Sequence, residues 1–113
     1  MRRAPGDPEA LRAAGEVALA LRVPDEAQAA LDALAKLMPN DADAQHLLGR
    51  ARRMAVDAAG AEQALQRALL LAPGHPGARA TLASLQLDTG RYAEADALYQ
   101  QIASRNLVAG RLG

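Results

Sequence analysis

The residues best suited to chemistry are two histidines and two aspartates near the middle of the chain. Asp41, Asp43 and His46 form the only compact group of potential metal ligands in the sequence. A histidine metal site needs further ligands at fixed spacing, and neither His46 nor His75 has a cysteine or a spaced histidine partner. Asp41 precedes a helical pattern and is expected to cap it. We therefore predict that the chain holds no metal ion.

A run of arginines, Arg50, Arg52 and Arg53, could form a phosphate-binding patch. Nucleic-acid-binding surfaces usually combine such a patch with aromatic side chains and a positive net charge. Here 13 Lys and Arg residues balance 13 Asp and Glu residues, and only 2% of the residues are aromatic. We predict no nucleic-acid binding but a solvated face with one arginine that contacts a ligand. The methylenes of Arg52 should pack inside while its charge reaches solvent.

Motifs for covalent catalysis or phosphate chemistry are absent from the sequence. It contains no cysteine, no glycine-rich phosphate loop and no serine between the glycines of a nucleophile elbow. No two carboxylates are predicted to point into one pocket. We therefore predict that the protein is not an enzyme and needs no cofactor.

The length and composition limit the scaffold that could position these residues. A chain of 113 residues fits a single domain, residues 1–113. Half of the residues are hydrophobic, but Phe and Trp are absent, so alanine and leucine must build the core. Because buried apolar surface contributes only ~25 cal/mol per Å², a core of small side chains predicts modest stability.

The hydropathy pattern predicts a soluble protein of the cytoplasm. Asp7, Pro8 and Glu9 stand where a signal peptide would place its apolar run. The best apolar run, residues 68–72, is far shorter than the ~20 residues that span a bilayer. We expect neither export nor membrane insertion.

Internal repetition is the strongest structural signal. Pro5, Pro39 and Pro73 are separated by 34 residues at each step (39 − 5 and 73 − 39). The same step links four sets of small or apolar residues: Gly15, Gly49 and Ala83; Ala27, Ala61 and Ala95; Leu31, Leu65 and Tyr99; and Ala14, Leu48 and Leu82. Apolar residues recur at helical spacing within each period, so each unit is predicted to be two amphipathic helices.

Prolines and turn residues mark the expected ends of these helices. Pro8, Pro24 and Pro76 fit first helical positions, where the missing N–H of proline costs nothing. No segment alternates as a strand would. The predicted helices span about 8–21, 25–37, 42–55, 58–71, 76–88 and 92–105.

A 34-residue helix–turn–helix period with these columns resembles the tetratricopeptide repeat (TPR), and the resemblance covers nearly the whole chain. In that family a small residue of the first helix meets a small residue of the second, as Gly15 with Ala27 or Gly49 with Ala61 would. The resemblance implies an all-α fold, an α-solenoid whose six antiparallel helices wind as a right-handed superhelix around a concave groove. Its three repeats would span about 8–41, 42–75 and 76–109.

The sequence departs from the family pattern at several places. The aromatic residue near the start of each first helix is replaced, by Leu11, Gln45 and Arg79. The second unit lacks the turn glycine and carries Ala-Val-Asp-Ala at 55–58. The last unit lacks a closing proline, so its second helix is expected to run on toward Gly110.

The resemblance also implies where a partner binds, because the first helices line the groove in this family. Carried over position by position, the lining is Glu9, Arg12, Glu16, Leu19, Asp43, His46, Arg50, Arg53, Met54, Ala80, Ser84, Leu87 and Asp88. An amphipathic helix or extended peptide of another protein, with apolar anchors and some acidic residues, suits this mixed lining. Met54 is expected to line the groove, whereas Leu19 and Leu87 could equally belong to the core.

Some family members bind the C-terminal carboxylate of heat-shock proteins through lysine and asparagine at fixed positions. Those positions here hold Arg12, Glu16, Leu47, Gly77 and Thr81. The negative charge of Glu16 would repel a carboxylate, so we predict that this ligand does not bind.

The leading functional hypothesis is a protein–protein interaction module, either an adaptor or a chaperone. The chain is similar in size and layout to the small TPR-type chaperones of bacterial type III secretion, which would make protein transport its context. One alternative is a structural unit that dimerises or stacks end to end through uncapped terminal helices. Another alternative is the TPR part of a larger regulator or enzyme.

Overall fold

The computed structural model describes the backbone of residues 6–112 and the side chains of residues 6–104. Within this range the chain forms helices and no strand. The helices are α1 (Pro8–Ala20), α2 (Pro24–Leu37), α3 (Ala42–Met54), α4 (Ala58–Leu71), α5 (Pro76–Asp88) and α6 (Tyr92–Leu112). The predicted ends agree within one residue except at the end of α6, which was placed at about 105 and lies at Leu112. This longer helix fits the expected extension toward Gly110, where the closing proline is missing. No helix of the described range is long and apolar enough to cross a bilayer.

Side chains that accept hydrogen bonds from free backbone N–H groups fix where the helices begin. Asp7 and Asp57 cap α1 and α4 in this way. Asp41 caps α3 as predicted, because its Oδ1 accepts two backbone N–H groups at 2.9 and 3.2 Å. The imidazole of His75 does the same for α5, with a backbone nitrogen 2.9 Å from its Nδ1.

The turns inside the three helix pairs have one common geometry. Arg22, Val56 and Gly90 occupy the same position of the 34-residue period, and all three have a left-handed backbone, with φ of 59°, 62° and 78°. Such a conformation is favourable only for glycine, since a Cβ crowds the following carbonyl. The missing turn glycine of the middle pair therefore leaves a β-branched valine in a strained conformation.

Each first helix packs on its second helix through a glycine or alanine. A Cβ added to Gly49 would lie 2.7 Å from Leu65 Cδ2 and 3.5 Å from the carbonyl oxygen of Ala61. Gly15 makes the equivalent contact with Leu31. Because there is no room for a side chain at these glycines, the leucine of the second helix fills the space directly over the first.

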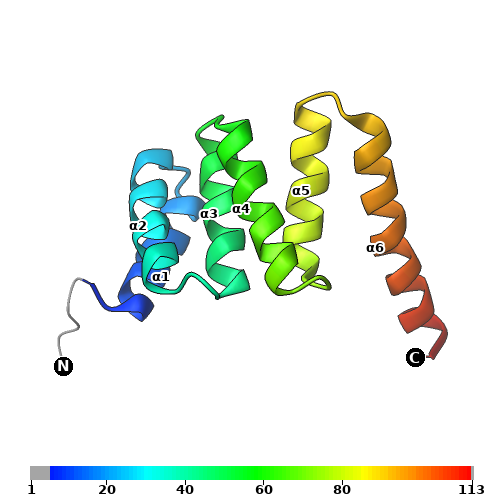
Figure 1. The fold of residues 1–113 in the computed structure, drawn as a ribbon, viewed down its shortest axis with the longest axis horizontal. Coiled ribbons are helices and arrows are strands. Elements are labelled where there is room, and N and C mark those ends of the chain that lie inside the picture. The colour runs from blue at the N-terminus through cyan, green and yellow to red at the C-terminus, as the bar shows by residue number, and fades with distance from the viewer. Residues whose placement is uncertain (1–5, 113) are drawn as a thin grey trace.

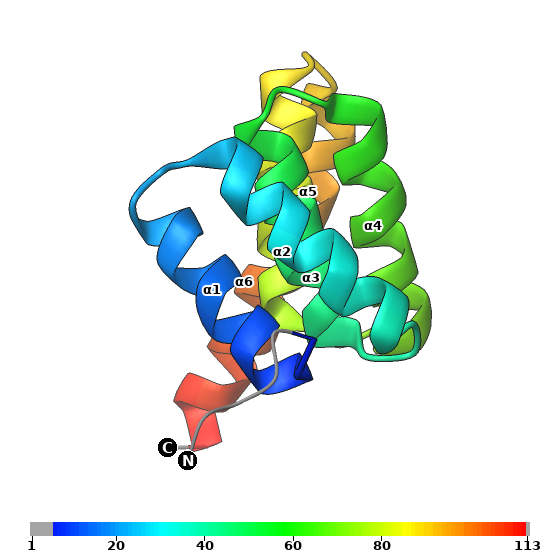
Figure 2. The same cartoon turned by 90° about the vertical axis from the view of Figure 1, so that its left-hand side faces the viewer.

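The helix pairs stack in sequence order along the long axis, so that α1 and α6 lie at opposite ends (Figure 1). The first helix of each later pair packs on both helices of the pair before it: α3 contacts α1 and α2, and α5 contacts α3 and α4. Viewed along the stack, α1 and α4 lie on opposite sides, with α2 and α3 between them (Figure 2). This is the helical solenoid expected from the 34-residue period. Within residues 6–112, α6 contacts no helix except α5.

Arg52 has polar partners within the chain. Its side chain is partly buried and contacts residues of α2 and α4. Its Nη1 donates to the carbonyl oxygen of Gly60 at 3.1 Å, and its Nη2 lies 3.6 Å from Asp32 Oδ1. Partners within the chain thus meet donors of this partly buried guanidinium. That its charge reaches solvent stays a prediction.

Candidate functional site

The first helices α1, α3 and α5 share one side of the stack, which we call the first-helix face. A cleft of about 280 Å³ opens on it. Its lining comes from α1 and the turn after it, from α3 and from α5: Leu19, Arg22, Arg50, Arg53, Met54, Thr81 and Asp88. Because three successive helix pairs contribute, the cleft exists only when the pairs are stacked.

The apolar part of the cleft is a continuation of the core. Leu19 is buried in the core cluster that α1, α2 and α3 form, and Met54 is partly buried against the same cluster. Leu19 therefore belongs to the core, one of the two alternatives left open by the sequence. The edge of Leu19 and the side chain of Met54 still line the cleft, so a ligand there would meet an apolar surface beside charged groups.

A bidentate ion pair closes one side of the cleft. Arg53 Nε donates to Asp88 Oδ2 at 2.6 Å, and its Nη2 donates to Oδ1 at 3.3 Å. This hydrogen bonding holds the pKa of the Asp88 carboxyl below its ordinary value. The pair links α3 to α5, and both side chains remain exposed enough to meet a ligand.

The other two arginines of the cleft carry unbalanced charge. No described residue makes a hydrogen bond or an ion pair to the guanidinium groups of Arg22 or Arg50. With Arg53, three guanidinium groups face one carboxylate, Asp88, so two positive charges are left over. Although the whole chain is neutral, the cleft is locally basic and attracts a carboxylate or another anion.

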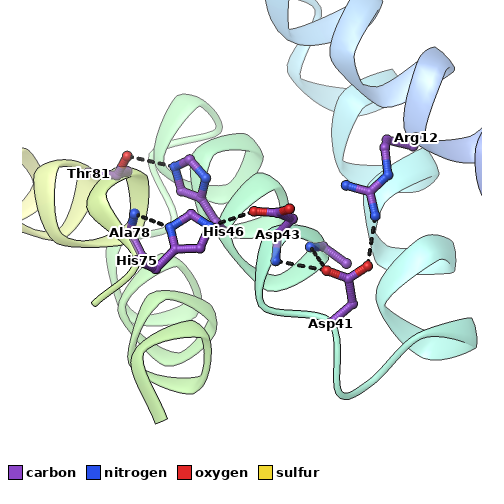
Figure 3. A network of polar contacts seen from close by, with 8 residues as sticks. Arg12, Asp41, Asp43, His46, His75, Ala78 and Thr81 are labelled. Carbon is purple, nitrogen blue, oxygen red and sulfur yellow. Dashed lines mark hydrogen bonds and ion pairs between the residues drawn. The ribbon is translucent and has the colours of Figure 1, made fainter. Parts of the chain in front are cut away.

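A chain of polar contacts crosses the same face nearer the helix N-termini (Figure 3). Arg12 Nη2 donates to Asp41 Oδ2 at 2.8 Å, which ties α1 to the start of α3. His75 Nε2 donates to Asp43 Oδ1 at 2.6 Å, which ties the start of α5 to α3. Since the Nδ1 of His75 accepts a backbone N–H, its proton must sit on Nε2 in the neutral ring. These contacts hold neighbouring helix pairs in register.

His46 lies on α3, and its ring packs against α5. Its Nε2 lies 3.1 Å from Thr81 Oγ1, and a Cβ on Gly77 would come within 2.6 Å of its ring. Burial, together with the nearby charges of His75 and Arg50, lowers the pKa of His46 to about 4. His46 is therefore neutral at pH 7, and its ring acts as a packing element.

The two histidine rings lie closer together than the sequence suggested, with centroids 5.1 Å apart. Both nitrogens of His75 are nevertheless occupied, by Asp43 and by a backbone N–H. Among the residues that the structure describes, no three His, Asp or Glu side chains are placed to hold a metal ion.

The predicted groove residues fall into three groups: those bonded to other residues of the chain, those that are exposed, and those that line the cleft. Arg12, Asp43 and His46 are bonded within the chain, as described above. Glu9, Glu16, Ala80 and Leu87 are exposed, and Ser84 Oγ lies 3.5 Å from the hydroxyl of Tyr99. Arg50, Arg53, Met54 and Asp88 come together in the cleft. A role in binding a partner stays a prediction for the whole set.

Arg22 lines the cleft but was not among the predicted groove residues. It lies in the turn after α1, and the prediction considered only the first helices themselves. The signal that could have found it is its place in the period, since the equivalent turn positions 56 and 90 also follow first helices.

Comparison with known families and structures agrees with this architecture. Residues 54–107 match the family described as tetratricopeptide repeat. A structure of MamA from Desulfovibrio magneticus RS-1, from residue 41 to the end, superposes with a TM-score of 0.83 at 23% identity, over 88% of this chain and 56% of that one. Another crystal structure of MamA gives a TM-score of 0.81 at 27% identity, over 88% and 58%. No curated protein sequence matches the chain. The chain thus spans a little over half the length of the structures it resembles.

Proposed function

Because residues 54–107 match the tetratricopeptide repeat family and the whole stack resembles solved structures of helix pairs, we propose that this chain binds a segment of another protein on its first-helix face, as an adaptor or chaperone of the cytoplasm. Residues 1–113 would act as one domain, with repeats at about 8–41, 42–75 and 76–109. The bound segment would be an amphipathic helix or an extended peptide.

The cleft between α1, α3 and α5 is the observation that carries this proposal. It places the unpaired guanidinium groups of Arg22 and Arg50 beside the apolar surface of Met54. An acidic side chain followed by an apolar one would satisfy both parts at once. The preferred segment therefore carries Asp or Glu next to a leucine-like anchor.

The size of the cleft argues for a protein segment over a small molecule. Pockets for drug-sized ligands usually measure ~300–1,000 Å³ and are mostly apolar. This cleft is about 280 Å³ and its lining is rich in charged groups. It can take one or two side chains of a longer ligand whose remaining contacts extend along the first-helix face.

Selection of a displayed peptide library on the purified chain tests the proposal. We expect the selected peptides to share an acidic residue beside an apolar one, and replacement of that Glu by Gln to weaken binding about tenfold, as loss of one charge-assisted contact would. Fluorescence anisotropy of labelled peptides at two salt concentrations measures both the affinity and its electrostatic part.

A pair of double variants locates the binding surface. Arg53→Glu with Met54→Glu changes the cleft, whereas Arg67→Glu with Leu70→Glu makes the same chemical change on exposed residues of α4. We expect the first variant to lose peptide binding while its circular dichroism spectrum stays helical, and the second to bind normally. Equal affinities of the two variants would remove the first-helix face from the proposal.

The narrower proposal is a chaperone that covers an aggregation-prone segment of a protein destined for export. Its support is the size and three-pair layout, which are similar to those of small secretion chaperones. Such a chaperone, added in equimolar amount, should suppress light scattering by a client segment that binds the cleft. Fractionation of cells expressing the tagged chain tests the cytoplasmic location.

A further inference from the structure

A second hollow lies on the side of α3 that faces away from the cleft. It measures about 500 Å³, and its lining comes from the end of α2 and the turn after it, from α3 and from α4: Ala35, Lys36, Pro39, Gln45, Leu48, Arg52, Gln63, Ala64 and Arg67. At helical spacing, the α3 residues of this lining and those of the cleft fall on opposite sides of the helix. Since α2 and α4 do not contact each other, the hollow is a groove between them, which we call the α2–α4 groove.

The α2–α4 groove contains a buried polar group without a partner. Gln45 is only 8% exposed, yet no described residue hydrogen-bonds to its side-chain carboxamide. Buried amides in proteins nearly always have hydrogen-bond partners, because an unpaired one costs free energy. Since Gln45 lines the groove, a ligand bound there can supply the missing donor and acceptor.

The walls beside Gln45 are apolar and consist mostly of small side chains. Ala35 of α2, Leu48 of α3 and Ala64 of α4 are buried in the core and line the groove. None of the lining residues is aromatic, and Gln45 itself replaces an aromatic residue of the family pattern. The groove therefore has room for an apolar ring that this chain does not provide.

The rim of the groove is positively charged. Lys36, Arg52 and Arg67 contribute three cations to the lining, which contains no carboxylate. The carboxylate oxygens of Asp32 lie 3.4 Å from Lys36 Nζ and 3.6 Å from Arg52 Nη2. Arg67 has no carboxylate partner among the described residues, and its Nη2 donates only to the carbonyl oxygen of Pro39, at 3.5 Å. One carboxylate thus faces three cations, and the remaining positive charge attracts an acidic ligand.

The amide, the apolar walls and the charged rim together select a ligand. A tyrosine has an apolar ring for the walls and a hydroxyl that both donates and accepts, as the carboxamide of Gln45 requires. Guanidinium groups also stack favourably on aromatic rings. Acidic neighbours of the tyrosine would pair with Lys36 and Arg67. We propose that the α2–α4 groove binds a tyrosine flanked by acidic residues in a segment of a partner protein.

The next junction of the stack has a hollow at the equivalent place but with different chemistry. That hollow, of about 780 Å³, has Arg79 in the position of Gln45 and Gln101 in the position of Arg67. Arg79 Nε already donates to the carbonyl oxygen of Pro73 at 3.0 Å. An acidic tyrosine segment should therefore prefer the α2–α4 groove, because of these two hollows it is the one with an unpartnered amide inside a strongly positive rim.

The α2–α4 groove is separate from the peptide site on the first-helix face. The groove and the cleft share no lining residue and lie on opposite sides of α3. A segment in one therefore leaves the other open. A chain with both sites occupied would connect two partner segments, which is more than the proposed binding of one segment in the cleft.

Matched peptides test the ligand. The probe is a fluorescein-labelled peptide with a tyrosine between glutamates, and two further versions carry phenylalanine or leucine in place of the tyrosine. In fluorescence anisotropy titrations with the full chain, the tyrosine peptide should bind about threefold to tenfold more tightly than the phenylalanine peptide, as one neutral hydrogen bond provides. The leucine peptide, which lacks the ring, should bind most weakly. No binding, or equal affinity of the tyrosine peptide and either other version, would overturn the proposal.

Variants of the chain locate the binding. Gln45→Phe fills the groove with a ring of the chain itself and should weaken binding of the tyrosine peptide at least about tenfold. Arg67→Glu with Leu70→Glu reverses the rim charge through exposed residues and should do the same with unchanged circular dichroism. Arg53→Glu with Met54→Glu alters the cleft instead and should bind the tyrosine peptide normally. Unchanged binding by Arg67→Glu with Leu70→Glu, or a loss confined to the cleft variant, would contradict the proposal.

Nuclear magnetic resonance supplies a readout at the amide itself. On addition of the tyrosine peptide, the side-chain amide signals of Gln45 should shift more than those of Gln100, which lines the equivalent hollow at the next junction. Larger shifts at Gln100 would assign the peptide to that hollow and overturn the proposal. The two double variants have opposite expected effects on peptides of the cleft, so a failure of the groove and a failure of the cleft give different results.

Discussion

The middle helix pair and the last helix pair have the same repeat positions but different neighbours. Leu65 of α4 is fully buried because α5 packs over it, whereas the equivalent Tyr99 of α6 is 40% exposed. A hollow of about 780 Å³ also separates α6 from the turn between α4 and α5. The difference teaches that burial in this solenoid is set by the following pair as much as by the residue itself.

The largest expected effect is that of Leu65→Ala. Removing a fully buried leucine leaves a cavity over Gly49, which we expect to cost about 2–5 kcal/mol of unfolding free energy. Tyr99→Ala at the equivalent position should cost less than half as much, because much of the ring is already in water. Urea denaturation followed by circular dichroism measures both. Similar losses would mean that the two pairs are equally packed.

The second largest effect should come from acidification, which weakens the contact of His46 on α3 with α5. His46 has a folded pKa of about 4 against an ordinary value of 6.5, so the unfolded chain binds the proton more readily. Stability therefore falls as the pH drops from 6.5 toward 4, by roughly 1 kcal/mol at pH 5, because the ring is only partly buried and solvent screens part of its charge.

Thermal denaturation at pH 5 and pH 7, in native protein and in His46→Gln, measures this contribution. The variant should lose most of the pH dependence in that range. The lowered pKa values of Asp43 and Asp88 act in the same direction, but only as the pH falls through their folded pKa values, below the ordinary 3.8. An unchanged pH profile in His46→Gln would mean that the ring is not desolvated between α3 and α5.

The turns of the middle and last pairs differ by a smaller amount in backbone strain. Val56 and Gly90 share a left-handed backbone, which costs a β-branched residue ~1–2 kcal/mol and glycine almost nothing. Val56→Gly should stabilise the chain by about 1 kcal/mol after the entropy of the added glycine is subtracted, since the Val56 side chain is exposed and has little packing to lose. Gly90→Val should destabilise by a similar amount. Chemical denaturation gives both signs, and a loss of stability in Val56→Gly would contradict the strained turn.

The smallest effect concerns the ion pair that joins the two pairs across the cleft. Arg53→Ala should change unfolding free energy by less than ~1 kcal/mol, because both charges of the Arg53–Asp88 pair are exposed to water and screened by salt. The same variant should weaken peptide binding clearly if the cleft is the binding site. A stability loss as large as that of Leu65→Ala would mean that the pair is a structural contact.

Much of the fold was predictable because equivalent residues make the same packing contacts in each of the three helix pairs. The residues repeated every 34 positions, such as Gly15, Ala27 and Leu31, predicted the helix pairs. Proline and aspartate predicted where helices begin, since each favours a helix N-terminus through its own backbone or side chain. The candidate site was less predictable. Arg50, Arg53, Met54 and Asp88 were expected on one face, but the sequence could not tell that Arg53 pairs with Asp88 or that Arg22 joins them.

The sequence by itself determined the period, the helix ends and the small residues on which the helices cross. These depend on spacing and on backbone preferences that each segment carries alone. Only the tertiary structure decided which charged side chains form ion pairs within the molecule, such as Arg12 with Asp41 and Arg52 with Asp32. It also decided that Val17 and Tyr99 remain uncovered. The physical reason is that burial and charge pairing depend on the neighbouring helix pair, which lies a full period away or beyond the end of the stack.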